Sequence, residues 1–367
     1  MAANPNRLSI TAKMDKISIL KSSRDELLSD MQECGIIDKP YRLDQILQNI
    51  YHNCVTDFAE MTSLSKPLRE TLSNKYDILL LREEQRWTSS DGTIKFLFEL
   101  NTDRQFVESV YLKDKNNRVT FCVSSQVGCR MGCTFCKTGR MGLIRNLTSA
   151  EILSEVLFLW NIMKHDESVT DKFFNIVFMG MGEPLDNIDN LCAAIDKITS
   201  QQYIGMSQTR ITISTCGLVD KIESVLMRFP QINFALSLNS SRQEQRLTVM
   251  PVAKLHSISE MKKILDGLAV KYKTRFTLEY VMIADFNISY EDAAALKCWT
   301  PKHYLINLIP LNHSDDKQQR PTEKQIAKFA DMLQKFGLKA TRRYRRGADI
   351  QADCGQLFLE RVEKLNK

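Results

Sequence analysis

Three cysteines in one short segment are the residues of this chain best suited to chemistry. Cys129, Cys133 and Cys136 stand in a Cys-x3-Cys-x2-Cys pattern. A cubane iron-sulfur cluster usually takes one cysteine ligand for each of its four irons. Three cysteines therefore leave one iron open to a small molecule, and an open iron is a reaction site rather than an electron store. The pattern favours a reactive iron-sulfur cluster.

Two other uses of clustered cysteines fit the sequence less well. A structural zinc site usually has two cysteine or histidine pairs, and here only Cys133 and Cys136 form such a pair. The nearest histidine, His165, has no second ligand pair around it. A disulfide framework is typical of short secreted chains, whereas this chain has 367 residues with cysteines spread along it. Spacing alone favours iron-sulfur and leaves zinc open.

A second motif follows an apolar segment further along the chain, and it reads Gly180-Met181-Gly182-Glu183-Pro184. Glycines at a strand end let a ligand approach the backbone closely. A glutamate can accept hydrogen bonds from an ammonium or hydroxyl group. Alone, the motif is typical of an ordinary turn between a strand and a helix. Downstream of the three-cysteine loop, it indicates a ligand site.

Basic residues gather in two places, although the net charge is only +6. Around the cysteines they are Arg130, Lys137, Arg140 and Arg145. Near the C-terminus they are Lys339, Arg342, Arg343, Arg345 and Arg346. Basic groups beside a reactive centre favour a polyanionic substrate such as a nucleic acid. A solvated surface is the alternative for either group.

Composition indicates a globular, cytoplasmic protein. Hydrophobic residues make up 43% of the chain and charged residues 26%, which is ordinary for a soluble fold. No apolar stretch approaches the roughly 20 residues that span a bilayer, so no membrane contact is predicted. The N-terminus lacks the continuous apolar core of a signal peptide. Reduced thiols and an oxygen-sensitive cluster both indicate the cytoplasm.

The elements that must position these motifs alternate between strand and helix. Strands are predicted at 174–179, 210–214, 232–238, 275–282 and 304–309, and helices at 149–163, 188–198, 258–270 and 322–336. This alternation favours parallel strands with crossover helices, and a sheet that curls into a barrel gathers reactive loops at its C-terminal strand ends. Short strands are also predicted before the cysteine loop, at 94–100, 106–112 and 118–124.

Together the two motifs resemble the radical S-adenosylmethionine superfamily. Residues 121–129, 145–148 and 347–357 narrow the resemblance to the RlmN/Cfr family of RNA adenosine methyltransferases. It covers roughly residues 90–357. The implied fold is α/β, a partial (β/α)6 TIM-like barrel with a helical accessory domain and a small β extension. The implied parts are an RNA-binding domain at 1–75, the extension at 76–122, the radical core at 123–346 and a C-terminal segment at 347–367.

The resemblance also implies a reaction path. The open iron of a [4Fe-4S] cluster binds S-adenosylmethionine, and the reduced cluster cleaves it to a 5′-deoxyadenosyl radical. Cys354 would first be methylated, and a second S-adenosylmethionine would activate that methyl group for addition to an adenine carbon. Glu108 would accept the ring proton, and Cys122 would then attack the sulfur of Cys354, leaving a transient disulfide. The cluster ligands would be Cys129, Cys133 and Cys136.

The cofactor contacts of the family carry over to residues near the predicted strand ends. These are Gly182, Glu183, Ser214, Ser237, Leu238, Asn239 and Asn312. Asn239 departs from the family pattern, which commonly has histidine at this position. An adaptable hydrogen bond would preserve cofactor binding, whereas a requirement for imidazole would weaken it.

The implied activity is methylation of carbon 2 of an adenosine in 23S rRNA, with tRNA left open as a second substrate. The implied partner besides RNA is an electron donor such as flavodoxin or ferredoxin, and a monomer is expected. Pro184 favours the RlmN branch over the Cfr branch, which methylates carbon 8. Two alternatives differ in class: a radical enzyme with another substrate, which would need neither Cys122 nor Cys354, and a nonenzymatic RNA-binding or zinc-stabilised protein.

Overall fold

A computed structural model describes residues 16–169, 173–299, 302–312, 318–343, 346–352 and 355–357. The chain forms two compact units that divide between Ile78 and Leu79. Cys354, the predicted methyl carrier, and Arg345 lie outside the described residues. Among the helices that the structure describes, none is long and apolar enough to cross a membrane.

The first unit is helical because its apolar residues recur at helical spacing. Its helices are α1 (Arg24–Glu33), α2 (Pro40–Tyr51) and α3 (Lys66–Lys75). Ser23 and Glu26 form a capping box at the start of α1, and the apolar stripe of α2 is buried. Two short strands, β1 (Ile17–Ser18) and β2 (Tyr76–Asp77), pair in parallel. The predicted helical N-terminal region is confirmed.

The second unit is built on one ten-stranded sheet, ordered β14-β13-β12-β11-β10-β9-β6-β5-β4-β3. The strands from β6 to β14 in this sheet pair in parallel. They are β6 (Val119–Val123), β9 (Phe174–Phe178), β10 (Ile211–Thr215), β11 (Asn233–Ser237), β12 (Phe276–Met282), β13 (Tyr304–Pro310) and β14 (Ala340–Arg342). The predicted parallel strands are therefore confirmed.

The short strands predicted before the cysteine loop belong to the same sheet, and one further strand, which was not predicted, precedes them. Strands β3 (Leu81–Thr88), β4 (Ile94–Leu100) and β5 (Phe106–Lys113) extend it from the β6 edge with antiparallel pairing. Each of these strands is joined to the next by a short connection, and short connections between neighbouring strands require antiparallel pairing.

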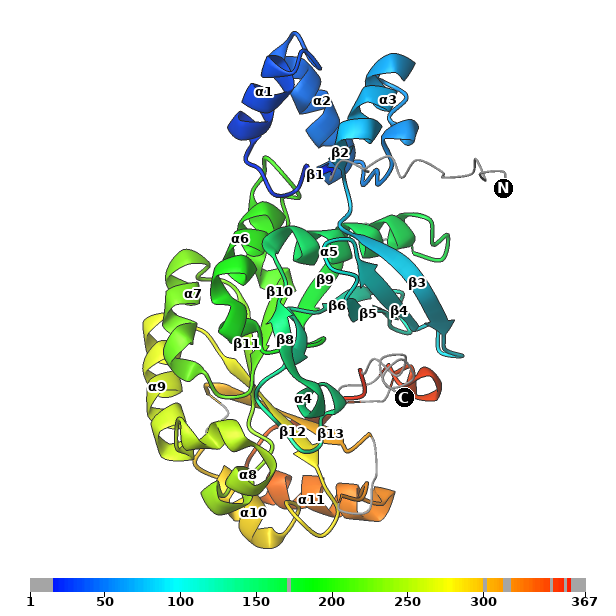
Figure 1. Cartoon of the computed structure of the whole chain (residues 1–367). Helices are drawn as coiled ribbons and strands as arrows, with labels where there is room; N and C mark the ends of the chain where they lie inside the picture. Colours follow the sequence, from blue (N-terminus) through cyan, green and yellow to red (C-terminus); the bar gives the residue numbers. More distant parts are fainter. Residues whose placement is uncertain are drawn as a thin grey trace, which may run out of the picture. The chain divides into compact units, whose positions relative to one another are not determined.

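Helices connect the parallel strands and form a layer outside the curved sheet (Figure 1). They are α5 (Ser149–Lys164), α6 (Ile188–Thr199), α7 (Ile222–Arg228), α8 (Gln243–Val249), α9 (Ile258–Lys271), α10 (Tyr290–Leu296) and α11 (Glu323–Lys335). Because consecutive parallel strands are neighbours and a helix crosses between them, the unit has the predicted architecture of a partial barrel.

A small hairpin carries the cysteine loop. Strands β7 (Gln126–Cys129) and β8 (Gly142–Asn146) pair in antiparallel fashion, and helix α4 (Lys137–Met141) lies between them in the chain. Cys129 is the last residue of β7, and Cys136 is the residue before α4. The hairpin thus fixes both ends of the segment that holds the three cysteines.

Candidate active site

One cavity at the C-terminal edge of the parallel strands collects most of the predicted site residues. Its lining includes Cys129, Cys133, Cys136, Gly182, Glu183, Ser214, Ser237, Asn239 and Asn312. Parallel strands bring their C-terminal ends to one edge of a sheet, so residues far apart in the chain meet there. Leu238 is the exception, because it is fully buried and is not among the residues that line this cavity.

The three cysteines offer a ligand set suited to an iron-sulfur cluster. Cys129 and Cys133 are each 8% exposed, and Cys136 is half-buried. Burial raises the pKa of the Cys129 thiol to about 12, whereas a hydrogen bond from the Cys216 thiol lowers the pKa of Cys133. In the described residues no three His, Cys, Asp or Glu side chains converge as ligands of a single metal ion would. A cubane is different, because each cysteine binds its own iron.

Glu183 presents a carboxylate to the same cavity. Its Oε1 accepts a hydrogen bond from the Leu185 amide at 3.2 Å, and its Oε2 accepts one from the Cys216 amide at 2.8 Å. Burial raises the pKa of Glu183, although these hydrogen bonds oppose the shift. Each carboxylate oxygen can accept a further hydrogen bond, so Glu183 can receive an ammonium group from a ligand in the cavity.

The two glycines before Glu183 are required by the protein's own chain. A Cβ on Gly182, whose φ is +100°, would lie 2.6 Å from Cβ of Gln126. A Cβ on Gly180 would lie 2.6 Å from the carbonyl oxygen of Val123. Both glycines therefore allow the segment after β9 to contact the chain, Gly180 at the end of β6 and Gly182 at the start of β7, and their role in ligand approach stays a prediction.

Hydroxyl and amide groups at the strand ends complete the lining of this cavity. The Ser214 and Ser237 hydroxyls, on neighbouring strands, lie 3.4 Å apart. Asn239 has a positive φ of 55°, which asparagine tolerates better than most residues. Its Oδ1 accepts a hydrogen bond from the Val281 amide at 3.0 Å. The side chain of Asn239 thus joins the segment after β11 to β12.

A second cavity adjoins the first. Its lining includes Cys122, Arg118, Arg343 and Arg346, and it shares Met179 and Leu357 with the first cavity. The described residues on either side of Cys354 border these cavities: Ala352 lines the second and Gly355 lines the first.

The segment after Cys354 also contacts the cysteine loop directly. The Lys137 amide donates to the Gly355 carbonyl at 3.0 Å, and the Thr138 hydroxyl donates to the Leu357 carbonyl at 2.7 Å. Both donors belong to α4, which begins immediately after Cys136. The C-terminal segment is therefore anchored beside the cluster ligands.

Comparisons with known proteins decide the family. The model of the ribosomal RNA large subunit methyltransferase N-terminal domain matches residues 17–78, and that of the radical SAM superfamily matches residues 123–296. The dual-specificity RNA methyltransferase RlmN of Syntrophotalea carbinolica is 39% identical, over 88% of this chain and 85% of that protein. This chain belongs to the RlmN family of radical SAM enzymes.

Two further relatives agree with the family. The probable dual-specificity RNA methyltransferase RlmN of Aquifex aeolicus is 36% identical over 92% of this chain and 96% of that protein. A crystal structure of a radical SAM methyltransferase from Sphaerobacter thermophilus superposes with a TM-score of 0.86 at 33% identity, covering 93% of this chain and 99% of that one. The predicted α/β radical SAM fold and the predicted enzyme class are confirmed.

In this RlmN-family chain, Glu108 lies on the sheet face that carries Cys122. Lys95 and Cys122 both pair with Val110, and Glu108 precedes Val110 by two residues, so all four side chains share one face. Glu108 is 2% exposed and forms an ion pair of 3.3 Å with Lys95. The pair lines neither of the two cavities described above. The register places the predicted base near the predicted resolving thiol.

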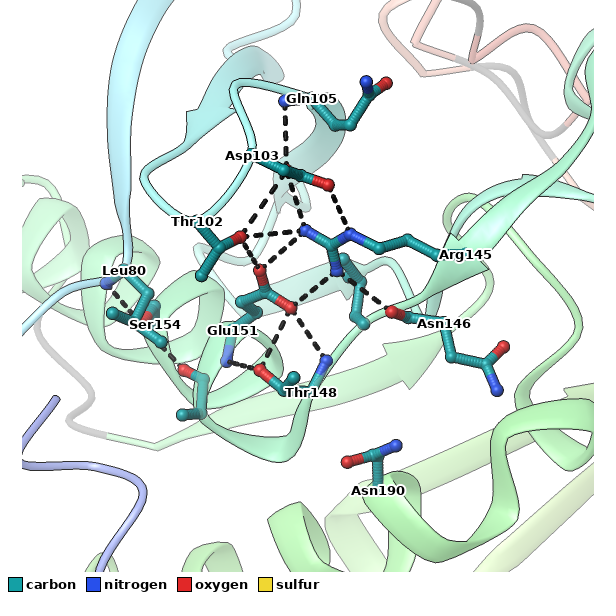
Figure 2. Close-up of polar contacts among 12 residues, drawn as sticks. Leu80, Thr102, Asp103, Gln105, Arg145, Asn146, Thr148, Glu151, Ser154 and Asn190 are labelled. Atoms are coloured by element: carbon teal, nitrogen blue, oxygen red, sulfur yellow. Dashed lines mark hydrogen bonds and ion pairs between the residues drawn. The ribbon is translucent and has the colours of Figure 1, made fainter.

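Arg145, one of the basic residues around the cysteine motif, is held by acidic side chains (Figure 2). Its guanidinium donates to Asp103 at 2.6 Å and to both oxygens of Glu151 at 2.9 Å. The hydrogen bond from Arg145 lowers the pKa of Asp103. Arg130 likewise pairs with Asp186 at 2.8 Å. Arg145 is thus engaged within the fold, and its predicted part in a substrate patch stays a prediction.

Three residues of the site region were missed by the sequence analysis: Lys95, Cys216 and Arg246. Cys216 was not singled out from the sequence, yet it lines the first cavity and its amide donates a hydrogen bond to Glu183 at 2.8 Å. The position of Cys216 offered a signal, because it directly follows β10 in the same way that Asn239, a predicted cofactor contact, lies just after β11. Lys95 and Arg246 carried no such signal, since their roles depend on burial that only the fold reveals.

Proposed function

We propose that this RlmN-family enzyme methylates carbon 2 of an adenosine in 23S rRNA and in tRNA, with Cys354 as methyl carrier. The observation that carries the proposal is the junction of the two cavities at Met179 and Leu357. One cavity holds the three cluster cysteines, and the other holds Cys122 and several arginines. RNA as the substrate class is supported by the names of the relatives, and carbon 2 by the family resemblance.

The first cavity would hold the cofactors. Cys129, Cys133 and Cys136 would ligate the [4Fe-4S] cluster, and the carboxylate of Glu183 would accept hydrogen bonds from the amino group of S-adenosylmethionine. When bound, two molecules of S-adenosylmethionine and the cluster supply a methyl group for Cys354 and the radical that activates it. The remaining cofactor contacts would come from Gly182, Ser214, Ser237, Asn239 and Asn312, with Leu238 contributing through its backbone.

The face shared by Cys122 and Glu108 would complete the reaction. Glu108 would remove the proton from the methylated ring carbon, as a carboxylate base within reach of that proton. The thiolate of Cys122 would then attack the sulfur of Cys354, so that a sulfur–sulfur bond forms as the sulfur–carbon bond to the RNA breaks. We further propose that the enzyme acts as a monomer, with flavodoxin or ferredoxin as electron donor.

Mass spectrometry of RNA tests the proposed product. Ribosomal and transfer RNA from cells that lack this protein would be compared with RNA from cells complemented by wild type or by Cys354→Ala. We expect 2-methyladenosine in 23S rRNA and in tRNA with wild type and none with Cys354→Ala. Methyl at carbon 8 would instead place the enzyme with the Cfr branch. Unchanged methyladenosine in every strain would contradict RNA methylation altogether.

A trapped adduct tests the role of Cys122. Cys122→Ala would retain cofactor binding and methyl transfer to RNA but could not release the product. We expect a covalent protein–RNA species on denaturing gels with Cys122→Ala, and its absence with the double variant Cys122→Ala/Cys354→Ala. A radical enzyme with another substrate would give no adduct with either variant.

A further inference from the structure

Arg246 is a fully buried cation whose guanidinium is only partly satisfied. It lies on α8 and is 0% exposed. Its Nε donates to the Leu238 carbonyl at 3.0 Å, and its Nη2 donates to the Cys216 carbonyl at 2.6 Å. Its Nη1 has no hydrogen-bond partner among the described residues. Two of its nitrogens thus donate to neutral carbonyls, and the third forms no hydrogen bond with the described residues.

The positive charge of Arg246 has no negatively charged partner among the described residues. None of the carboxylates in the described part of the chain lies within ion-pair distance of its guanidinium. An arginine does not lose its proton in a protein, so it cannot escape burial by becoming neutral. A buried charge without a counter-charge costs several kcal/mol. A negative group is therefore expected close to Arg246.

The neighbours of Arg246 point to the cluster site. The Cys216 carbonyl that accepts from Arg246 belongs to a residue that lines the first cavity together with the three predicted cluster ligands. A Cβ on Gly217 would lie 3.1 Å from Nη2, so the chain leaves the guanidinium room on this side only because Gly217 has no side chain.

The carboxylates of Glu183 and Glu279 line the first cavity. The oxygens of Glu183 accept from the Leu185 and Cys216 amides, and Glu279 forms an ion pair with Arg343. Among the described residues, neither carboxylate forms an ion pair with Arg246. A cluster bound by three thiolates carries a net negative charge, and reduction by one electron increases that charge by one unit. The cluster is therefore the anion that the surroundings of Arg246 lack.

We propose that Arg246 is the counter-charge of the iron-sulfur cluster and raises its reduction potential. The proposal rests on the cluster assigned under the proposed function. Because reduction adds negative charge, a buried cation stabilises the reduced cluster more than the oxidised one. Arg246 is a positioning residue in this role, since it acts on the cluster through its charge and through its bond to the Cys216 carbonyl.

The competing explanation is that Arg246 only clamps two loops together. Its bonds to the Leu238 and Cys216 carbonyls join the ends of β11 and β10. A clamp and a counter-charge differ in what replaces the arginine. Lysine keeps the charge but loses the fork of donors, whereas glutamine keeps a donor and an acceptor but loses the charge. Only a counter-charge makes the two variants differ in reduction potential.

The test is a redox titration followed by electron paramagnetic resonance. Wild type, Arg246→Lys and Arg246→Gln would be reconstituted anaerobically with iron and sulfide and titrated without S-adenosylmethionine. At a fixed potential we expect the ratio of reduced to oxidised cluster in Arg246→Gln to fall about tenfold, a shift of 59 mV for a one-electron couple. Arg246→Lys should stay closer to wild type than to Arg246→Gln.

Each remaining outcome has a defined meaning. Equal potentials in all three proteins, or equal shifts in both variants, overturn the proposal and support a clamp. If Arg246→Gln retains less iron and sulfide than Arg246→Lys, the charge is needed to hold the cluster and the proposal stands. If both variants lose the cluster alike, the proposal is wrong. Wild type that binds no iron or sulfide would overturn the proposed function instead, so the two failures are distinguishable.

Discussion

At the scale of single residues, the Lys95–Glu108 pair shows how burial sets the properties of a proposed base. Lys95 is 7% exposed and Glu108 2% exposed, and their 3.3 Å contact keeps opposite charges together away from water. Lys95 also lies over the Trp87 ring at 4.7 Å. Removing one partner of a buried pair leaves an uncompensated charge, and this costs more than the pair contributes.

We therefore expect Lys95→Met to destabilise the folded protein, because it leaves the buried carboxylate of Glu108 without its cation. Unfolding in urea should show a loss of about 3–5 kcal/mol for Lys95→Met. The double variant Lys95→Met/Glu108→Gln should regain part of that loss. A double variant that loses the full sum would show that the pair is not coupled.

Glu155 offers a pH-dependent prediction at the same scale. It lies on α5 with no exposed surface and accepts hydrogen bonds from the Ser109 hydroxyl and, at 2.9 Å, from the Ser124 amide. Burial raises the pKa of Glu155 from 4.5 to about 8. The folded state therefore holds a proton that the unfolded state releases near pH 4.5, so the stability it contributes is full below that pH and is lost as pH rises toward 8.

The measurement compares the free energy of unfolding of wild type and Glu155→Gln in urea at several pH values. Relative to the variant, wild type should lose up to about 1.4 kcal/mol per pH unit between the two pKa values. Glutamine stays neutral, so it keeps the shape of the side chain without this slope. Two parallel curves across that range would mean that Glu155 ionises normally in the folded protein.

At the scale of elements, the helices and strands that could be predicted from the sequence are those with a long pattern in adjacent residues. Strand β4 was predicted at its observed bounds, and α5 was predicted to begin at Ser149, as it does. Thr148 and Glu151 form the capping box of α5, which is a signal written in adjacent residues. The parallel strands β6 and β9 to β13 carry similarly clear apolar runs.

The elements that were missed are short and depend on contacts distant in the chain. Strands β7, β8 and β14 have four, five and three residues, and helix α4 has five. Elements this short do not show a clear period in the sequence. Strand β3 consists mostly of polar and charged residues without an alternating apolar pattern, and it is a strand because it pairs with β4 along its length. In the site, the cysteines and Glu183 could be predicted from sequence motifs. Lys95, Cys216 and Arg246 could be identified only from the burial and strand register of the folded chain.

The start of α5 provides a prediction at this scale. Arg145 bridges Asp103 and the buried Glu151. Burial acts to raise the pKa of Glu151, but the hydrogen bonds from Arg145 and the Thr148 amide outweigh burial, so the pKa of Glu151 is lowered. We expect Arg145→Met to lower the free energy of unfolding, measured in urea, by about 2–3 kcal/mol. The loss is smaller than for a fully buried pair because Arg145 is partly exposed. Arg130→Met, which breaks a more exposed pair with Asp186, is the matched control and should cost about 0–1 kcal/mol. Equal losses would contradict this account.

At the scale of the whole molecule, the modest net charge of +6 is less informative than where the arginines lie. The C-terminal basic group was predicted to hold phosphates, and the structure separates its members. Arg343 and Arg346 line the second cavity beside Cys122. Arg342 forms an ion pair with Glu323, at 2.6 Å, and does not line that cavity. Arg343 and Arg346 are also held within the fold, by Glu279 at 3.8 Å and by the Lys113 carbonyl at 2.6 Å, but they line the cavity. Of these three arginines, we therefore expect Arg343 and Arg346 to meet RNA that reaches Cys122.

Salt dependence of RNA binding distinguishes these arginines. Each phosphate contact by a cation releases counterions, so removing one reduces the slope of log affinity against log salt by about 1. Arg343→Gln and Arg346→Gln should each show this reduction with a 23S rRNA fragment, whereas Arg342→Gln should keep the wild-type slope. Binding would be measured by fluorescence anisotropy over a series of salt concentrations. If Arg342→Gln lowers the slope as much as the other two, the phosphates are held by the surface of β14 and not by the cavity that contains Cys122.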